Sequence, residues 1–163
     1  MNGARDAVGR RGTDQAINLL VIGYGNTLRS DDGVGPRVAE AVGRMRLPRV
    51  STVTSQQLSP EHADIVSQAG QVVFVDAAVD APGTVQFRKL APGKTSQLMA
   101  HAADPGTLLA LARDVFGRTP EAWWLTIPAS NMEFGETLSP ETQRGLEEAL
   151  EKIRGLCSPL RRG

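Results

Sequence analysis

The residues best suited to chemistry lie in a glycine-rich stretch, residues 23–36, that directly follows the apolar run 17–22. Gly23 and Gly25 after an apolar run are typical of a phosphate-binding turn at the end of a strand. The same stretch, however, carries two adjacent carboxylates, Asp31 and Asp32, which would repel a phosphate. This combination indicates a site for a cation.

Known phosphate-binding motifs fit the stretch poorly. A dinucleotide fingerprint needs a third glycine three residues after the second, and that residue is Leu28. No Gly-Lys-Ser/Thr follows, so the stretch is not a P-loop. A purely structural role is also possible, in which the glycines allow close packing and an aspartate caps the helix that begins near Pro36.

Asp32, Asp76 and His101 together form a candidate metal site. Two carboxylates and one imidazole suit a borderline divalent cation such as nickel or zinc. Three protein ligands leave coordination positions open for water or substrate. Neighbouring residues of a loop rarely face one point, so we expect only one of Asp31 and Asp32 to be a ligand. The other would bind backbone N–H groups that hold the turn.

Other catalytic arrangements have little support in the sequence. His62, the second of two histidines, falls within a short helical pattern and is expected to be a surface or packing residue. His101 instead lies in a long polar loop, residues 93–105. The single cysteine, Cys157, excludes an internal disulfide and a cysteine-rich zinc site. No Gly-x-Ser-x-Gly elbow is present, and Trp123 and Trp124 are expected in the core.

Strand and helix patterns alternate along the chain. Apolar or alternating runs predict strands at residues 17–22, 50–54, 72–75, 84–90 and 123–127. Helical patterns begin near Pro36, Ser59, Leu108 and Ser139, with Ser59 and Ser139 expected as N-caps and Gly70 expected to end the second helix. The alternation predicts an α/β fold, a three-layer α/β/α sandwich with a mostly parallel sheet. The first and third strands would be neighbours, so the glycine turn and Asp76 would meet at their carboxyl ends.

The 163 residues are expected to form one domain over residues 17–157, after a disordered extension (1–16) and before a short tail (158–163). Eighteen basic and eighteen acidic residues balance, which gives no reason to expect binding to nucleic acid or to a membrane. The first fifteen residues lack the apolar run of a secretory signal. We therefore expect a cytoplasmic protein.

The pattern Gly-x-Gly-Asn-x-Leu-x-x-Asp-Asp-Gly-x-Gly resembles the opening signature of the nickel–iron hydrogenase maturation endopeptidases. The matching residues are Gly23, Gly25, Asn26, Leu28, Asp31, Asp32, Gly33 and Gly35. The apolar strand that ends in Asp76, the turn 82–84, the loop with His101 and the residues 138–140 before the last helix are also similar to that family. The resemblance extends over residues 17–155.

The resemblance implies a five-stranded central sheet and an endopeptidase that removes the C-terminal extension of a hydrogenase large-subunit precursor after nickel insertion. Asp32, Asp76 and His101 would contact nickel that the substrate carries, so no permanently bound metal is required. Asp32 or Asp76 would act as general base toward water, and the sequence does not choose between them. Gly23, Gly25, Asn26, Asp31, Gly33 and Gly35 would support the site. The protein is expected to be a monomer.

Two other functions remain open at this stage. A non-catalytic nickel-sensing chaperone would bind the same precursor without cutting it. A nucleotide-binding α/β module would use the glycine turn for a phosphate, in spite of the two aspartates.

Overall fold

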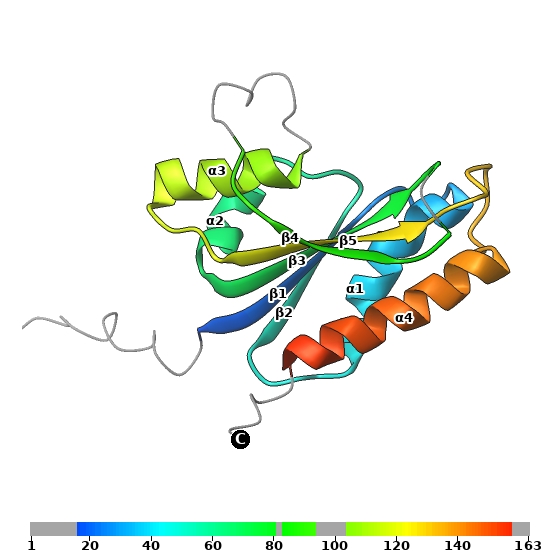
Figure 1. The fold of residues 1–163 in the computed structure, drawn as a ribbon, viewed down its shortest axis with the longest axis horizontal. Coiled ribbons are helices and arrows are strands. Elements are labelled where there is room, and N and C mark those ends of the chain that lie inside the picture. The colour runs from blue at the N-terminus through cyan, green and yellow to red at the C-terminus, as the bar shows by residue number, and fades with distance from the viewer. Residues whose placement is uncertain (1–15, 81–82, 94–103, 158–163) are drawn as a thin grey trace, which may run out of the picture.

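The computed structural model describes residues 16–80, 83–93 and 104–157, which form a sheet between two layers of helices (Figure 1). The strands are β1 (Ile17–Tyr24), β2 (Val50–Ser55), β3 (Ala69–Ala78), β4 (Gln86–Leu90) and β5 (Glu121–Pro128). The helices are α1 (Val34–Arg44), α2 (His62–Ser67), α3 (Pro105–Phe116) and α4 (Pro140–Cys157), and a 3-10 turn, η1 (Ser30–Gly33), precedes α1. This architecture confirms the predicted α/β sandwich.

The strand order is β2-β1-β3-β5-β4. All neighbouring pairs are parallel except β4 and β5, so β4 is an antiparallel strand at the edge of the sheet. β1 lies between β2 and β3, which makes the carboxyl end of β1 a topological switch point. Within the described ranges, no helix has the length and apolarity that a membrane span requires.

Alternating side chains of the central strands supply two separate cores. Val21 and Val75 point to the face covered by α1 and α4, where they pack with residues such as Val38 and Ile153. Ile22 and Phe74 point to the opposite face, which α2 and α3 cover. Figure 1 shows the two helix pairs on opposite sides of the sheet. This period of two decides which residues of β1, β3 and β5 share a face at the carboxyl edge.

Two local predictions need correction. Ser59 does not cap α2, which begins only at His62; instead the Ser59 amide donates to His62 Nδ1 at 3.0 Å. This bond gives His62 the local packing role expected for it. Gly70 does not end the helix but lies inside β3, because parallel pairing with β1 extends back to Ala69. Ser139 does cap α4, accepting from the amide of Thr142 at 3.3 Å.

The glycines of the turn allow α1 to start in direct contact with the sheet. A Cβ atom on Gly23 would overlap the carbonyl group of Gly35. A Cβ atom on Gly35 would lie 2.5 Å from the carbonyl oxygen of Val75 and 2.6 Å from that of Tyr24. Gly25 has a φ of 146°, which L-residues rarely adopt. The start of α1 is therefore fixed against both β1 and β3 through backbone atoms.

Replacement of Gly35 tests this contact. Gly35→Ala is expected to lower the free energy of unfolding by about 3 kcal/mol, since the strand ends that its methyl group meets are central to the sheet and cannot move apart. Gly155→Ala in α4 is the matched control, because in the described part of the chain no atom outside its own stretch of helix lies within 4 Å of its added Cβ. It should be neutral or stabilising by about 0.5–1 kcal/mol. Urea denaturation measures both, and equal effects would contradict the proposed close contact.

Candidate functional site

Two acidic side chains reach the carboxyl edge of the sheet at the switch point. Asp76 lies near the end of β3, and Asp32 lies in η1 directly after the glycine turn. The register that pairs Gly23 with Val75 continues to bring Tyr24 beside Asp76. The side chains of Tyr24 and Asp76 point to the face covered by α2 and α3, because each lies two residues after a core residue of that face.

The carboxyl group of Asp76 is a weaker acid than an ordinary aspartate. Burial raises its pKa to about 6, and the negative charge of Asp32 contributes to the rise. The hydroxyl group of Tyr24 and the backbone N–H of Ala77 favour the ionised form and oppose this rise only in part. The pKa of Tyr24 is well above its usual value, because the ring is buried and Asp76 is close. The two carboxylates are therefore near enough to repel each other, an arrangement that a shared cation would stabilise.

Asp32 is half-buried and helps to shape the turn that carries it. Its Oδ2 accepts a hydrogen bond from the amide of Asn26 at 2.8 Å, and Asn26 Oδ1 accepts one from the amide of Leu28 at 2.9 Å. No described residue donates a hydrogen bond to the other oxygen of Asp32, Oδ1. Asp32 can thus hold the turn with one oxygen and present the other to a ligand.

Asp31 has a structural role. Its carboxylate is fully buried and accepts from the amides of Ser130, Asn131 and Ser139 at 3.0, 2.9 and 2.7 Å, and from the Ser139 hydroxyl at 2.9 Å. Desolvation works against ionisation, but these hydrogen bonds outweigh it and lower the pKa of Asp31 to about 2. Asp31 binds backbone N–H groups, as expected for one of the pair, although they belong to the segment between β5 and α4.

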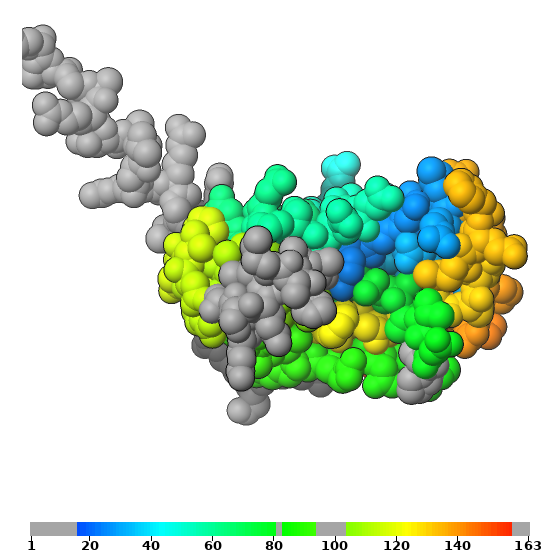
Figure 2. Space-filling model, turned by 90° about the horizontal axis from the view of Figure 1, so that it is seen from above, coloured from blue at the N-terminus to red at the C-terminus, as the bar shows by residue number. Residues whose placement is uncertain are grey.

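Main-chain bonds join the same two segments. The amide of Ser30 donates to the carbonyl of Gly135 at 2.8 Å, the amide of Gly135 to Leu28 at 2.9 Å, and the amide of Asp31 to Asn131 at 2.9 Å. In Figure 2 the orange residues of this segment lie at one end of the molecule, beside the blue residues of the first strand and turn. The turn that carries Asp32 is therefore anchored to the start of α4.

His101, the third predicted ligand, lies outside the described residues, and so does Pro82 of the turn 82–84. Asp104, just before α3, is described and caps that helix by accepting from the amide of Gly106 at 2.7 Å. Its charge contributes to the raised pKa of Tyr24, which places the start of α3 near the site. Among the described ranges no three side chains of the metal-ligating types lie close enough together to hold an ion. Asp32 and Asp76 are described, and their role as ligands stays a prediction.

A cavity of about 410 Å³ opens beside Asp76, and we call it the Asp76 pocket. Its lining residues are Asp76, Ala77, Ala78, Gln86, Arg88, Trp124 and Thr126. Trp123 and Trp124 pack against the two cores, as predicted, but both are only half-buried, and Trp124 also lines this pocket. Tyr24, Arg88 and Thr126 were also missed as site residues. Only the strand register, which sets Thr126 between Asp76 and Gln86, could have revealed the pocket.

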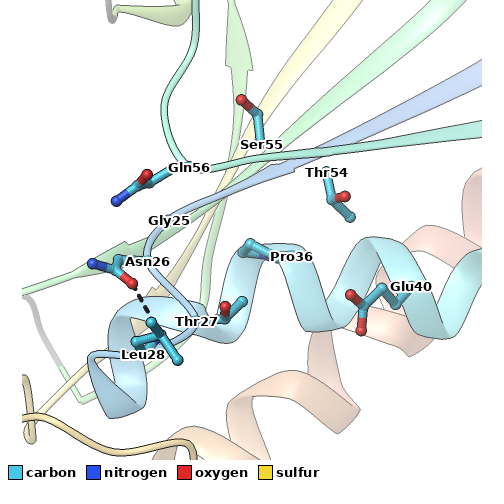
Figure 3. A pocket seen from close by; sticks show the side chains of 9 residues that line it. All are labelled: Gly25, Asn26, Thr27, Leu28, Pro36, Glu40, Thr54, Ser55 and Gln56. Carbon is cyan, nitrogen blue, oxygen red and sulfur yellow. Dashed lines mark hydrogen bonds between the residues drawn. The ribbon is translucent and has the colours of Figure 1, made fainter.

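A second cavity, of about 460 Å³, lies on the other side of the glycine turn (Figure 3). The turn residues 25–28 form one wall, α1 contributes Pro36 and Glu40, and the end of β2 contributes Thr54 and Ser55. In Figure 3 the side chain of Glu40 lies farther along α1 than that of Pro36. The turn that carries Asp32 therefore separates two hollows at the carboxyl edge.

The role of Asp31 predicts a defined pH signature. Asp31→Asn should lower the free energy of unfolding at pH 7 by about 3 kcal/mol, because the amide group cannot replace a carboxylate that accepts several hydrogen bonds. The lowered pKa means that this stabilisation is present above about pH 4 and is lost as the pH falls toward 2. Denaturation curves of both proteins should therefore converge at low pH. The exposed Asp80→Asn is the control, and a loss that did not depend on pH would contradict this role.

The raised pKa of Asp76 predicts a pH dependence of stability opposite to that of Asp31. The folded state binds the Asp76 proton more tightly than the unfolded state, so stability falls as the pH rises from about 4 to about 6, and the full penalty of the ionised Asp76 remains at higher pH. In chelator-treated protein, Asp76→Asn should be more stable than the wild type by about 1–3 kcal/mol at pH 7.5. The advantage should vanish near pH 4. Denaturation between pH 4 and 8 measures it, and an Asp76→Asn variant that is less stable at pH 7.5 would refute the assignment.

Comparison with known proteins identifies the fold. No protein-family model and no curated protein matches the chain. Among solved structures, the hydrogenase maturating endopeptidase HybD from E. coli is 24% identical, with a TM-score of 0.66 over 83% of this chain and 89% of that one. The NiFe hydrogenase maturation protease HybD from Thermococcus kodakarensis is 22% identical, with a TM-score of 0.64 over 86% and 99%. HycI from Thermococcus kodakarensis KOD1, also a NiFe hydrogenase maturation protease, is 18% identical, with a TM-score of 0.67 over 86% and 92%. The chain therefore has the fold of the NiFe hydrogenase maturation proteases.

Proposed function

We propose that this protein is an endopeptidase that removes the C-terminal extension of a nickel–iron hydrogenase large-subunit precursor after nickel insertion. Asp32, Asp76 and His101 contact the nickel ion that the precursor carries. The observation that supports this most strongly is that the glycine turn and the end of β3 bring Asp32 and Asp76 to the same edge of the sheet, where their charges interact. The shared fold and the glycine–aspartate signature of the turn add independent support.

Recognition through the cargo metal fits the electrostatics of this site. Two carboxylates that repel each other gain from a divalent cation between them, and the raised pKa of Asp76 falls when that cation binds. A precursor without nickel offers no such gain. Binding is then conditional on metal insertion, and the endopeptidase itself needs no resident metal.

The chemistry is hydrolysis of a peptide bond by water. The cargo cation polarises the scissile carbonyl, and a carboxylate takes the proton from the attacking water. A pKa of about 6 makes Asp76 both ionised at neutral pH and more basic than an ordinary carboxylate. Asp76 is therefore the better candidate for the general base, and Asp32, which is held by Asn26, is the better candidate for a fixed ligand.

The direct test incubates the nickel-loaded precursor with the protein and measures the precursor's mass. The wild type should shorten the precursor at its C-terminus and leave the nickel-free precursor intact. Asp76→Ala and His101→Ala should reduce the rate by a factor of about 10² or more, since each removes a group that acts on the reacting atoms. His62→Ala is the matched control and should keep full activity.

The possible outcomes separate the proposed function from its rivals. A nickel-loaded precursor that binds but keeps its C-terminus would identify a nickel-sensing chaperone. Tight nucleotide binding that survives Asp32→Ala would favour a nucleotide-binding module. Full processing by both Asp76→Ala and His101→Ala would remove these residues from the site.

A further inference from the structure

The Asp76 pocket is lined by a positively charged side chain, that of Arg88, which the proposed chemistry does not use. Arg88 is exposed on the edge strand β4, and its guanidinium carbon lies 5.9 Å from the centre of the Trp124 ring. Within the described part of the chain, no carboxylate forms an ion pair with Arg88. Its neighbour Lys89 points to the other face of the sheet and pairs with Glu121 at 3.6 Å. Arg88 is thus positioned by an aromatic ring and retains its capacity to bind an anion.

The wall beside Arg88 offers further hydrogen-bond donors. Trp124 Nε1 is buried and its N–H lies near the Tyr24 hydroxyl group, so it serves that residue and not the pocket. Gln86 and Thr126, which also line the pocket, carry an amide and a hydroxyl group. Asp76 is the only carboxylate in the described lining. The Arg88 end of the pocket is therefore suited to an acceptor group, and the Asp76 end to a cation.

The strand register sets the spacing between these two ends. Asp76 is aligned with Thr126 on β5, and Thr126 with Gln86 on β4. Arg88 lies two residues farther along β4, so its Cα is roughly 12 Å from that of Asp76, given the usual spacing of strands and residues. An extended polypeptide covers that distance in roughly three to four residues.

We propose that Arg88 binds a carboxylate of the substrate polypeptide, about three residues from the group held at Asp76. This inference rests on the proposed function, because it takes the substrate to be a polypeptide held at Asp76. Arg88 then selects substrates and sets their register, since a guanidinium recognises a carboxylate through two parallel hydrogen bonds. It takes no part in the reaction at the scissile bond.

Steady-state processing of the nickel-loaded precursor tests this role. Arg88→Gln should raise KM by about tenfold, as loss of one charge-assisted interaction predicts, and should change kcat by less than about twofold. Arg88→Lys should recover part of the affinity. Lys89→Gln is the matched control, because it removes the same charge from the adjacent residue on the opposite face. An unchanged KM in Arg88→Gln, or an equal rise in Lys89→Gln, would overturn the proposal.

Two sources of the carboxylate can be separated with variants of the precursor. If the carboxylate is an acidic side chain, its replacement by the amide should raise KM for the wild type and have no further effect on Arg88→Gln. If it is the terminal carboxylate of the extension, lengthening the extension with glycine and serine should instead raise KM for the wild type and leave KM of Arg88→Gln unchanged. Loss of affinity in neither series would contradict recognition of a carboxylate.

A binding measurement distinguishes failure of this inference from failure of the proposed function. The affinity of immobilised precursor for the wild type and for Arg88→Gln is measured without reference to cleavage. Weaker binding of Arg88→Gln to a precursor that is never cut would support the inference and refute the protease function. Cleavage with equal affinities would refute the inference alone, and a precursor neither bound nor cut by the wild type would refute both.

Discussion

The site depends on the direct contact between the backbone of β1 and the first turn of α1. Gly23 and Gly35 meet with no room for a side chain, and Gly35 also lies against the carbonyl groups of Tyr24 and Val75. This contact brings the turn that carries Asp32 to the end of β3, where Asp76 lies. Without it α1 would stand farther from the sheet, and the two carboxylates would lose the proximity that couples them.

The two adjacent aspartates of the turn divide structure and chemistry between them. Asp31 turns inward, where hydrogen bonds from the segment between β5 and α4 hold it ionised. Asp32 remains half-buried and bound at one oxygen by Asn26. The rigidity supplied by Asp31 allows Asp32 and Asp76 to stay close in spite of their repulsion. A cation held by the substrate would relieve that repulsion.

The sequence predicted the sandwich, the neighbouring positions of β1 and β3 and the common edge for Asp32 and Asp76, because alternating apolar runs and the glycine turn determine these features locally. It could not predict that Asp31 reaches Ser139, since that contact joins residues more than 100 positions apart. Trp124 was assigned to the core for a related reason: apolar character shows that a residue prefers burial, but only the register shows that it lies beside a pocket. The beginning of β3 at Ala69 was hidden by Gly70, which looked like a helix end.

The affinity of the protein for nickel-loaded and nickel-free precursor tests most directly whether Asp32 and Asp76 recognise a cation on the substrate. Titration of both precursor forms against the wild type and against an Asp32→Ala/Asp76→Ala variant provides this comparison. The loaded precursor should bind the wild type about 100-fold more tightly than the nickel-free form, a difference of about 3 kcal/mol, and the double variant should lose that preference. Equal affinities of the wild type for both forms, or a preference that persists in the double variant, would contradict recognition of the metal by these carboxylates.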